Sequence, residues 1–361
     1  MSFLTFNLPI NPVSFGQVSI GIMRELYKRK SKVIWYPVAN QFDLSTESNN
    51  EQFERWLHNS ITNFHWSHDR NFKSFKLWHL NGGMEAITKE QVLLSFYELD
   101  KPTNAEMNVI KNNYKVLFSN KDTVELFKSH GCDNVGYIPL GFDSTNFSKT
   151  KREVEEDKVI FSLLCKFEKR KNHEKVIKAW IKKYGNNKKY ALHCAVWNPF
   201  LSQEQNEAVI QSLLGGERYF NIIFSGFMQT NEQYNHFLNS SDVVLGMSGG
   251  EGWGLPEFQS VCIGKHAVIL NCCGYKSWAR EENSILIEPK GKIEAYDGVF
   301  FRQGDDFNQG SIHDFDVDDF ISGCEEAIKR VEASRDNVEG EKLAEEFSYS
   351  KMVDQIIKEL E

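Results

Sequence analysis

A glycine-rich segment between two apolar runs constrains the fold of this chain more than any other feature. Residues 249–256 read Gly-Gly-Glu-Gly-Trp-Gly-Leu-Pro and follow the apolar run 242–247. A helix-like stretch begins at residue 257, and a second apolar run covers residues 266–270. This order predicts a strand, a tight turn and a helix start, as in a parallel α/β sheet. Such a turn directs backbone N–H groups outward at the helix N-terminus, where they bind anions such as phosphate.

The same segment carries a carboxylate, Glu251, where a bare phosphate cradle would not favour one. A negative group beside an anion site suggests a ligand with both a diphosphate and a hydroxyl-rich part. The alternative is a glycine-rich connection with no ligand, because glycine patterns alone have many false positives.

Composition and charge are those of a globular protein with room for two domains. The chain has 361 residues, of which 41% are apolar and 25% charged, and a domain typically takes roughly 150 residues. The N-terminus has no signal-peptide pattern, and no run of about 18 apolar residues predicts a transmembrane helix. The net charge of −8 disfavours a nucleic-acid acceptor without excluding one.

The cysteines indicate a reducing compartment. All seven are scattered, and no Cys-x-x-Cys pair occurs, so we expect reduced thiols in a cytoplasmic protein. The adjacent Cys272 and Cys273 leave two interpretations open, a metal or redox site and two thiols at the edge of a core. We favour the second.

Strand-like and helix-like segments alternate through most of the chain. This alternation predicts two doubly wound α/β domains, residues 1–150 and 151–345, joined at a charged linker, residues 148–158. Ligands of such folds bind at the carboxyl ends of the strands, so we expect the site in a cleft where the two sheets face each other. We expect strands at residues 1–8, 32–37, 74–80, 92–96, 115–119, 135–139, 158–164, 190–196, 222–225, 243–247 and 266–271. We expect helices at residues 17–28, 52–60, 121–130, 172–183, 203–214, 231–239, 257–263, 318–333 and 340–360.

A cluster of basic residues follows the first strand of the second domain. The apolar run 159–165 ends there, and Lys166, Lys169, Arg170 and Lys171 crowd a short loop before a helix. Cations at the carboxyl end of a strand suit a diphosphate. A solvated basic loop is the alternative, but the glycine-rich segment further along the same sheet favours phosphate binding.

Several motifs, taken in order, resemble the family 4 retaining glycosyltransferases with the GT-B fold. Residues 251–256 are nearly the family's E-G-[FW]-G-[LI]-P, and residues 139–147 are similar to its P-x-G-[VIF]-D-x-x-x-F. Residues 166–172 resemble its G-R-x-x-x-x-K-G loop. The resemblance is good in the second half of the chain and weak in the first. Further matches lie at residues 224–227, 239–245 and 347–349.

The resemblance implies two Rossmann-like domains, with a C-terminal helix at residues 346–361 packing back on the first. It implies transfer of a sugar from a UDP-, GDP- or ADP-sugar to a hydroxyl of an unidentified acceptor (glycan, lipid or other), with retention and with no metal or other cofactor. Lys166 and Lys171 would neutralise the diphosphate, and Glu251 would accept hydrogen bonds from the transferred sugar. The donor-binding candidates are Gly226, Phe227, Gly252, Trp253, Gly254, Leu255 and Gln259.

The first domain should carry the acceptor. Gly16 matches the small-residue loop that approaches the leaving phosphate in this fold, and an ordinary turn glycine is the alternative. Glu98, in a stretch similar to F-E-x-x-x-x-P, is a candidate for positioning the acceptor, and a surface or cap carboxylate is the alternative. His79 ends a strand at the expected cleft, and a core or surface histidine is the alternative.

The chain also departs from the family pattern. Lys166 stands in place of the usual Arg and loses its bidentate geometry, and Cys165 and Asn172 stand in place of glycines. Gln259 replaces the second glutamate of the glycine-rich motif, whereas Glu257 is expected to point elsewhere on the helix. These departures leave open a non-catalytic nucleotide- or glycan-binding module. A GT-B-fold sugar-nucleotide epimerase is a further alternative.

Overall fold

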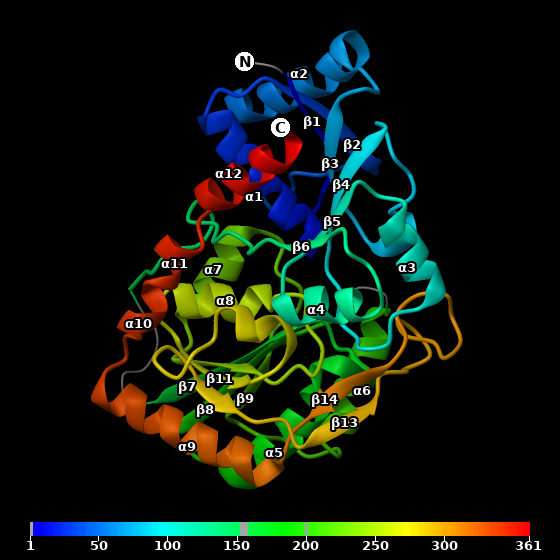
Figure 1. The fold of residues 1–361 in the computed structure, drawn as a ribbon. Helices are drawn as coiled ribbons and strands as arrows, with labels where there is room; N and C mark the ends of the chain where they lie inside the picture. The colour runs from blue at the N-terminus through cyan, green and yellow to red at the C-terminus, as the bar shows by residue number, and fades with distance from the viewer. Residues whose placement is uncertain (1–2, 152–157, 199–200) are drawn as a thin grey trace. The chain divides into compact units, whose positions relative to one another are not determined.

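The computed structural model describes residues 3–151, 158–198 and 201–361 (Figure 1). It divides into two compact units: unit 1 holds the residues up to Ser144, Gly304–Gln309 and Glu345–Glu361, and unit 2 holds Thr145–Gln303 and Gly310–Ala344. The expected boundary at residue 150 therefore falls inside unit 2. Residues 152–157 of the expected linker lie outside the described residues. No helix in the described ranges combines the length and the apolar character needed to cross a membrane.

Unit 1 is built on a parallel sheet of six strands in the order β2-β1-β3-β4-β5-β6. The direction of chain progression reverses between β1 and β3, so the carboxyl ends of these two strands flank a topological switch point. The strands are β1 (Leu4–Ile10), β2 (Val33–Phe42), β3 (Lys73–Leu77), β4 (Glu90–Ser95), β5 (Lys115–Phe118) and β6 (Val135–Tyr137).

Helices cover the sheet of unit 1. Helix α1 (Ser14–Lys28) packs on β1 and on the C-terminal helix α12 (Tyr349–Leu360), and α2 (Glu51–Ser67) packs on β2. Helices α3 (Asn104–Lys111) and α4 (Lys121–Ser129) contribute to a buried hydrophobic cluster through Val109, Ile110, Val124 and Phe127. Helix α3 was not expected from the sequence. It begins at a capping box, in which Thr103 accepts from the Glu106 N–H and Glu106 accepts from the Thr103 N–H.

The single helix expected at residues 340–360 is wrong. The structure has three helices there, α10 (Val338–Glu341), α11 (Leu343–Glu346) and α12. The helical conformation is interrupted before α12 because Ser348 has an extended backbone. Its hydroxyl accepts from the Lys351 N–H, which makes Ser348 the N-cap of α12.

A short segment from late in the chain, residues 304–309, belongs to unit 1, and we call it the strap. Asn308 donates its N–H to the buried carboxylate of Glu106 at 2.7 Å. Thr103 donates its hydroxyl to the Asp306 carbonyl at 2.5 Å, and the Lys101 N–H donates to the Gln309 carbonyl at 3.2 Å. The strap is thus fixed to the N-terminus of α3 by side-chain and backbone hydrogen bonds.

Unit 2 has its own parallel sheet of six strands, in the order β12-β11-β10-β7-β8-β9. The expected fold class, with two doubly wound parallel sheets, is therefore confirmed. Here the chain order reverses between β7 and β10. The strands are β7 (Val159–Cys165), β8 (Tyr190–Val196), β9 (Ile222–Phe224), β10 (Val243–Gly246), β11 (His266–Leu270) and β12 (Ile285–Ile287).

The two faces of this sheet are covered by different helices. Helices α5 (His173–Tyr184) and α9 (Val317–Ala333) share a core with the strands through Trp180, Phe320 and Ala327. Helix α8 (Leu255–Cys262) packs on β10 and β11, with the Phe258 ring 5.6 Å from that of Trp278. Neither β12 nor the antiparallel pair β13–β14 was expected. The remaining elements of unit 2 are α6 (Gln203–Leu213), α7 (Asn231–Asn239), β13 (Gly291–Glu294) and β14 (Ser311–Asp314).

Candidate active site

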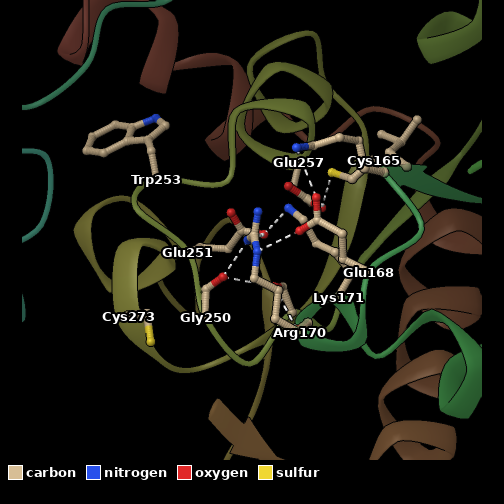
Figure 2. A network of polar contacts seen from close by, with 12 residues as sticks. Cys165, Glu168, Arg170, Lys171, Gly250, Glu251, Trp253, Glu257 and Cys273 are labelled. Atoms are coloured by element: carbon tan, nitrogen blue, oxygen red, sulfur yellow. Dashed lines mark hydrogen bonds and ion pairs between the residues drawn. The ribbon is translucent and has the colours of Figure 1, made fainter. Parts of the chain in front are cut away.

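Two loops meet at the switch point of unit 2. The basic loop, residues 166–171, leaves the carboxyl end of β7, and the glycine loop, residues 249–254, follows β10. The Gly249 N–H donates to the Arg170 carbonyl at 2.8 Å, and the Asn172 side chain donates to the Met247 carbonyl at 2.8 Å. Figure 2 shows charged side chains from both loops converging on one spot. The sequence therefore placed the two loops correctly relative to each other.

The centre of this spot is an ion pair between Lys171 and Glu251. Both side chains are buried, with residue exposures of 6% and 5%. Burial raises the pKa of Glu251, but Lys171 and Arg170 outweigh it and hold that pKa below its usual value. Burial lowers the pKa of Lys171, but Cys165 and Glu251 outweigh it and hold that pKa above its usual value. Both groups are therefore charged, and the pair is a preformed buried cation and anion.

The sequence indicated Arg170 only as one of four clustered cations, without a role of its own. Its guanidinium donates to the Gly250 carbonyl at 2.7 Å and to the Glu168 carboxylate at 2.9 Å, and lies 3.4 Å from Glu251. Burial raises the pKa of Glu168, but Arg170, Lys166 and Lys171 together hold it at about 2. The alternation of Arg170 with Glu168 within the basic loop was the signal of an ion pair. It does not distinguish a buried pair from a solvated one.

Lys166 lies away from the Lys171–Glu251 pair. Its ammonium is 2.9 Å from Glu168 and 5.1 Å from the centre of the Phe300 ring, and its side chain is 39% exposed. The two lysines that the sequence assigned to one diphosphate therefore sit differently. Lys171 is buried beside the glycine loop, and Lys166 is half-exposed at the start of the basic loop.

The glycine loop leads directly into α8. Gly254 has φ of 80°, and a Cβ there would lie 2.1 Å from the Tyr275 ring, so only glycine fits. Helix α8 starts at Leu255, and the first N–H groups of a helix have no partner within it. Trp253 contributes its backbone only, because its ring is buried against Phe258 and points away from the charged side chains (Figure 2).

Cys165, one of the departures from the family pattern, is in contact with Glu257. Cys165 has φ of 89°, a conformation typical of the glycine that the resemblance expects at this position. Its thiol donates to Glu257 at 3.7 Å. Glu257 is 3% exposed and lies beside Cys165, next to the basic loop. Burial raises its pKa to about 7, although Lys171 opposes that rise.

The remaining donor candidates are spread along the same sheet edge. Gly252 and Leu255 belong to the glycine loop and the start of α8. Gln259 lies on α8 and is 8% exposed. Gly226 and Phe227 follow β9, two strands from β7, and Phe227 is 50% exposed.

In unit 1, the three acceptor candidates lie at the carboxyl side of the sheet. Gly16 follows β1, His79 follows β3 and Glu98 follows β4. The centres of the Phe15 and His79 rings are 4.3 Å apart. His79 is exposed, and Glu98 is half-buried. A Cβ on Gly16 would lie 2.1 Å from the Asn11 carbonyl, so this glycine permits close packing of the turn after β1.

Residues 143–298 match the family described as glycosyl transferases group 1. This part of the chain resembles the group 1 glycosyl transferases. The matched residues contain both loops of the site. No curated protein matches the sequence.

Solved structures extend the likeness in fold to the whole chain. A sucrose-phosphate synthase from Thermosynechococcus elongatus has a TM-score of 0.68 at 12% identity, covering 99% of this chain and 97% of that one. HepE from Anabaena, in complex with UDP-glucose, has a TM-score of 0.68 at 10% identity, covering 99% and 98%. OtsA has a TM-score of 0.64 at 11% identity, covering 100% and 99%. The predicted GT-B glycosyltransferase resemblance is confirmed, and the assignment to family 4 stays a prediction.

The stability of this protein is expected to depend on pH through Glu257. The pKa of Glu257 is about 7 when folded and 4.5 without the fold, so the folded state holds a proton that the unfolded state has lost. Stability should therefore fall as the pH rises from about 4.5 to 7. Glu257→Gln should remove that slope and stabilise the protein at pH 8 by up to about 3 kcal/mol. Urea unfolding at pH 5, 6, 7 and 8 measures the effect.

Glu168→Gln is the control of opposite sign. The pKa of Glu168 is held at about 2, so its charge stabilises the fold above its unfolded pKa, and this contribution disappears as the pH falls. Glu168→Gln should destabilise the protein at pH 7. Equal pH slopes for the parent and Glu257→Gln would contradict the burial argument for Glu257.

Proposed function

We propose that this glycosyltransferase moves a sugar from a nucleotide-diphosphate sugar to an acceptor hydroxyl, with retention at the anomeric carbon and without a metal. The observation that carries the proposal is the Lys171–Glu251 pair, buried where the basic loop and the glycine loop meet the start of α8. Seven free cysteines support a reducing, cytoplasmic location.

The leaving group explains why a buried cation is useful there. Departure of a nucleoside diphosphate builds negative charge on its phosphate oxygens, and groups that stabilise this charge accelerate the step. Lys171 is held charged and immobile by Glu251, and Arg170 fixes the Gly250 carbonyl. In our proposal, the N–H groups at the start of α8 and the Lys171 ammonium receive the diphosphate, while Lys166 contacts it from the rim.

Glu251 has two tasks in this proposal. Without donor it keeps Lys171 charged inside the protein. With donor bound, the diphosphate competes for Lys171, and the Glu251 carboxylate can accept hydrogen bonds from hydroxyls of the transferred sugar. Gln259 would contact the ribose as a donor and acceptor of hydrogen bonds, and Phe227 offers an exposed ring beside the base.

A uridine donor is the first to test. HepE was solved with UDP-glucose, and the E. coli trehalose-6-phosphate protein, with a TM-score of 0.63 at 10% identity, was solved with UDP-2-fluoro glucose. These ligands belong to those proteins, and they support UDP-sugars as probes for this one. The acceptor side, with His79, Glu98 and Gly16, remains a proposal based on position at the sheet edge of unit 1.

The test is a donor panel. UDP-glucose, GDP-mannose and ADP-glucose are titrated by calorimetry, and slow hydrolysis of each is followed by NMR, with water as the acceptor. We expect one nucleotide to bind with micromolar affinity and the released sugar to appear first as the α-anomer from an α-linked donor. First appearance of the β-anomer would contradict retention. Folded protein that binds none of the three, nor UDP, GDP or ADP, would contradict the proposed function.

A further inference from the structure

Two adjacent cysteines lie directly beneath the glycine loop. Cys272 and Cys273 open the short 3₁₀ helix η3 (Cys273–Ser277), just after β11. The Cys272 thiol lies 3.5 Å from the Ser248 carbonyl, and the Cys273 thiol lies 3.7 Å from the Gly249 carbonyl. Cys272 is 1% exposed, whereas Cys273 is half-buried. Cys273 is therefore the less buried residue of the two.

The backbone around Cys273 holds the glycine loop in place. Gly274 donates its N–H to the Glu251 carbonyl at 2.9 Å, and His313 of β14 donates its N–H to the Gly249 carbonyl at 2.9 Å. The Cys273 sulfur thus sits where segments following β10 and β11 meet β14. Figure 2 shows Cys273 beside Gly250, with its sulfur pointing away from the charged side chains. Oxidation of this sulfur therefore takes place beside the hydrogen bonds that hold the glycine loop.

Cys273 has the surroundings of a reactive thiol. A hydrogen bond from Cys272 lowers its pKa; burial opposes this, and a hydrogen bond with His313 lowers it further, to a value below the usual range. Each of the other six cysteines has a raised pKa, with burial among its causes. The thiolate is the form that reacts with peroxides. Metal binding is not supported, because no group of three or more His, Cys, Asp or Glu in the described residues is arranged to hold an ion.

We propose that Cys273 is a site of oxidation by hydroperoxides, resolved by Cys272, and that its oxidation stops donor binding at the glycine loop. The second half of this inference rests on the proposed function. The Cys273 thiolate attacks the hydroperoxide, which gives a sulfenic acid and an alkoxide that takes up a proton to become the alcohol (water, for hydrogen peroxide). The Cys272 thiol then attacks the sulfenic sulfur, so a disulfide forms between the neighbours and water leaves. Two thiols are oxidised and one peroxide is reduced.

The test uses the full chain, reduced and then treated with graded hydrogen peroxide. Remaining thiols are alkylated, sulfenic acids are trapped with dimedone, and each cysteine is read by peptide mass mapping. We expect Cys273 to be half-modified at a peroxide concentration at least tenfold below that needed for Cys132, Cys165, Cys194, Cys262 or Cys324. UDP binding, measured by calorimetry, should weaken at least tenfold and recover with dithiothreitol.

Two variants separate the steps. Cys272→Ser should accumulate the dimedone adduct at Cys273, because no resolving thiol is present. Cys273→Ser, with Cys273→Ala as a second version in case of poor folding, should bind UDP like the parent and keep that binding after peroxide. Modification of other cysteines first, or unchanged UDP binding by protein oxidised at Cys273, would overturn the inference. Failure of reduced parent protein to bind any nucleotide would instead count against the proposed function, and the mass map would still decide the thiol chemistry.

Discussion

Replacing Lys171 by methionine is expected to lower donor turnover by about 10²- to 10³-fold, the usual effect of losing one preorganised group that stabilises transition-state charge. The same change leaves the Glu251 carboxylate buried without its main partner. Arg170 remains 3.4 Å away, so we expect a stability loss near the lower end of the range for broken buried pairs, about 3 kcal/mol. Donor hydrolysis and urea unfolding measure the two effects.

Two further variants distinguish catalysis from folding. Lys171→Met combined with Glu251→Gln removes the uncompensated charge, so stability should largely return while turnover stays low. Lys169→Met is the matched control in the same loop, because the Lys169 ammonium donates to the Tyr296 carbonyl at an exposed position. It should change turnover by less than about threefold and stability by less than about 0.5 kcal/mol. Full turnover in the double variant would remove Lys171 from the mechanism.

Gly274→Ala is expected to weaken nucleotide binding by about tenfold to a hundredfold. A Cβ at this position would lie 2.5 Å from the Gly252 carbonyl carbon and from the Trp253 nitrogen. Both contacts are with backbone, which cannot rotate aside, so the glycine loop must shift outward. Such overpacking typically costs about 1–3 kcal/mol of stability. The displaced loop would also lose the Gly274 hydrogen bond to the Glu251 carbonyl. UDP titration and urea unfolding test this.

Gly215→Ala controls for the general cost of replacing a glycine. Gly215 has φ of 61°, and no atom lies within 4 Å of the Cβ position. Alanine there should cost about 1–2 kcal/mol through backbone conformation alone, with UDP affinity unchanged. If Gly274→Ala bound UDP as tightly as Gly215→Ala does, the fixed position of the glycine loop would not matter for binding.

Much of the fold was predictable because parallel strands are buried on both faces and read as apolar runs. Strands β7 and β10 are fully or nearly buried and were expected within a residue or two of their observed ends. Short or exposed elements were not predicted from the sequence. Strand β13 is exposed along its length, so it carries no apolar pattern, and β12 has three residues. Helix α3 was not predicted because its eight residues are too few to show a helical period.

The site was predictable as two loops but not as a set of contacts. The spacing of charges in the basic loop could not tell which side chains turn inward. Arg170 and Lys171 lie in a short 3₁₀ helix and are buried, whereas Lys166, five residues before Lys171, stays at the surface. Glu257 was set aside because the family places its carboxylate two residues later. The position of Glu257 in the first turn of α8, facing Cys165, is a property of the packed helix and sheet.

The path of the chain through the strap limits how this protein can be recombined with its relatives. The polypeptide enters unit 1 three times, through the N-terminal segment, the strap and the C-terminal segment. An exchange of unit 2 between homologues at one junction would separate Asn308 from its acceptor Glu106 and would remove α12 from α1. Chimeras therefore need matched crossovers at each passage, and insertions or deletions between residues 303 and 310 should be rarer among descendants than in other surface loops.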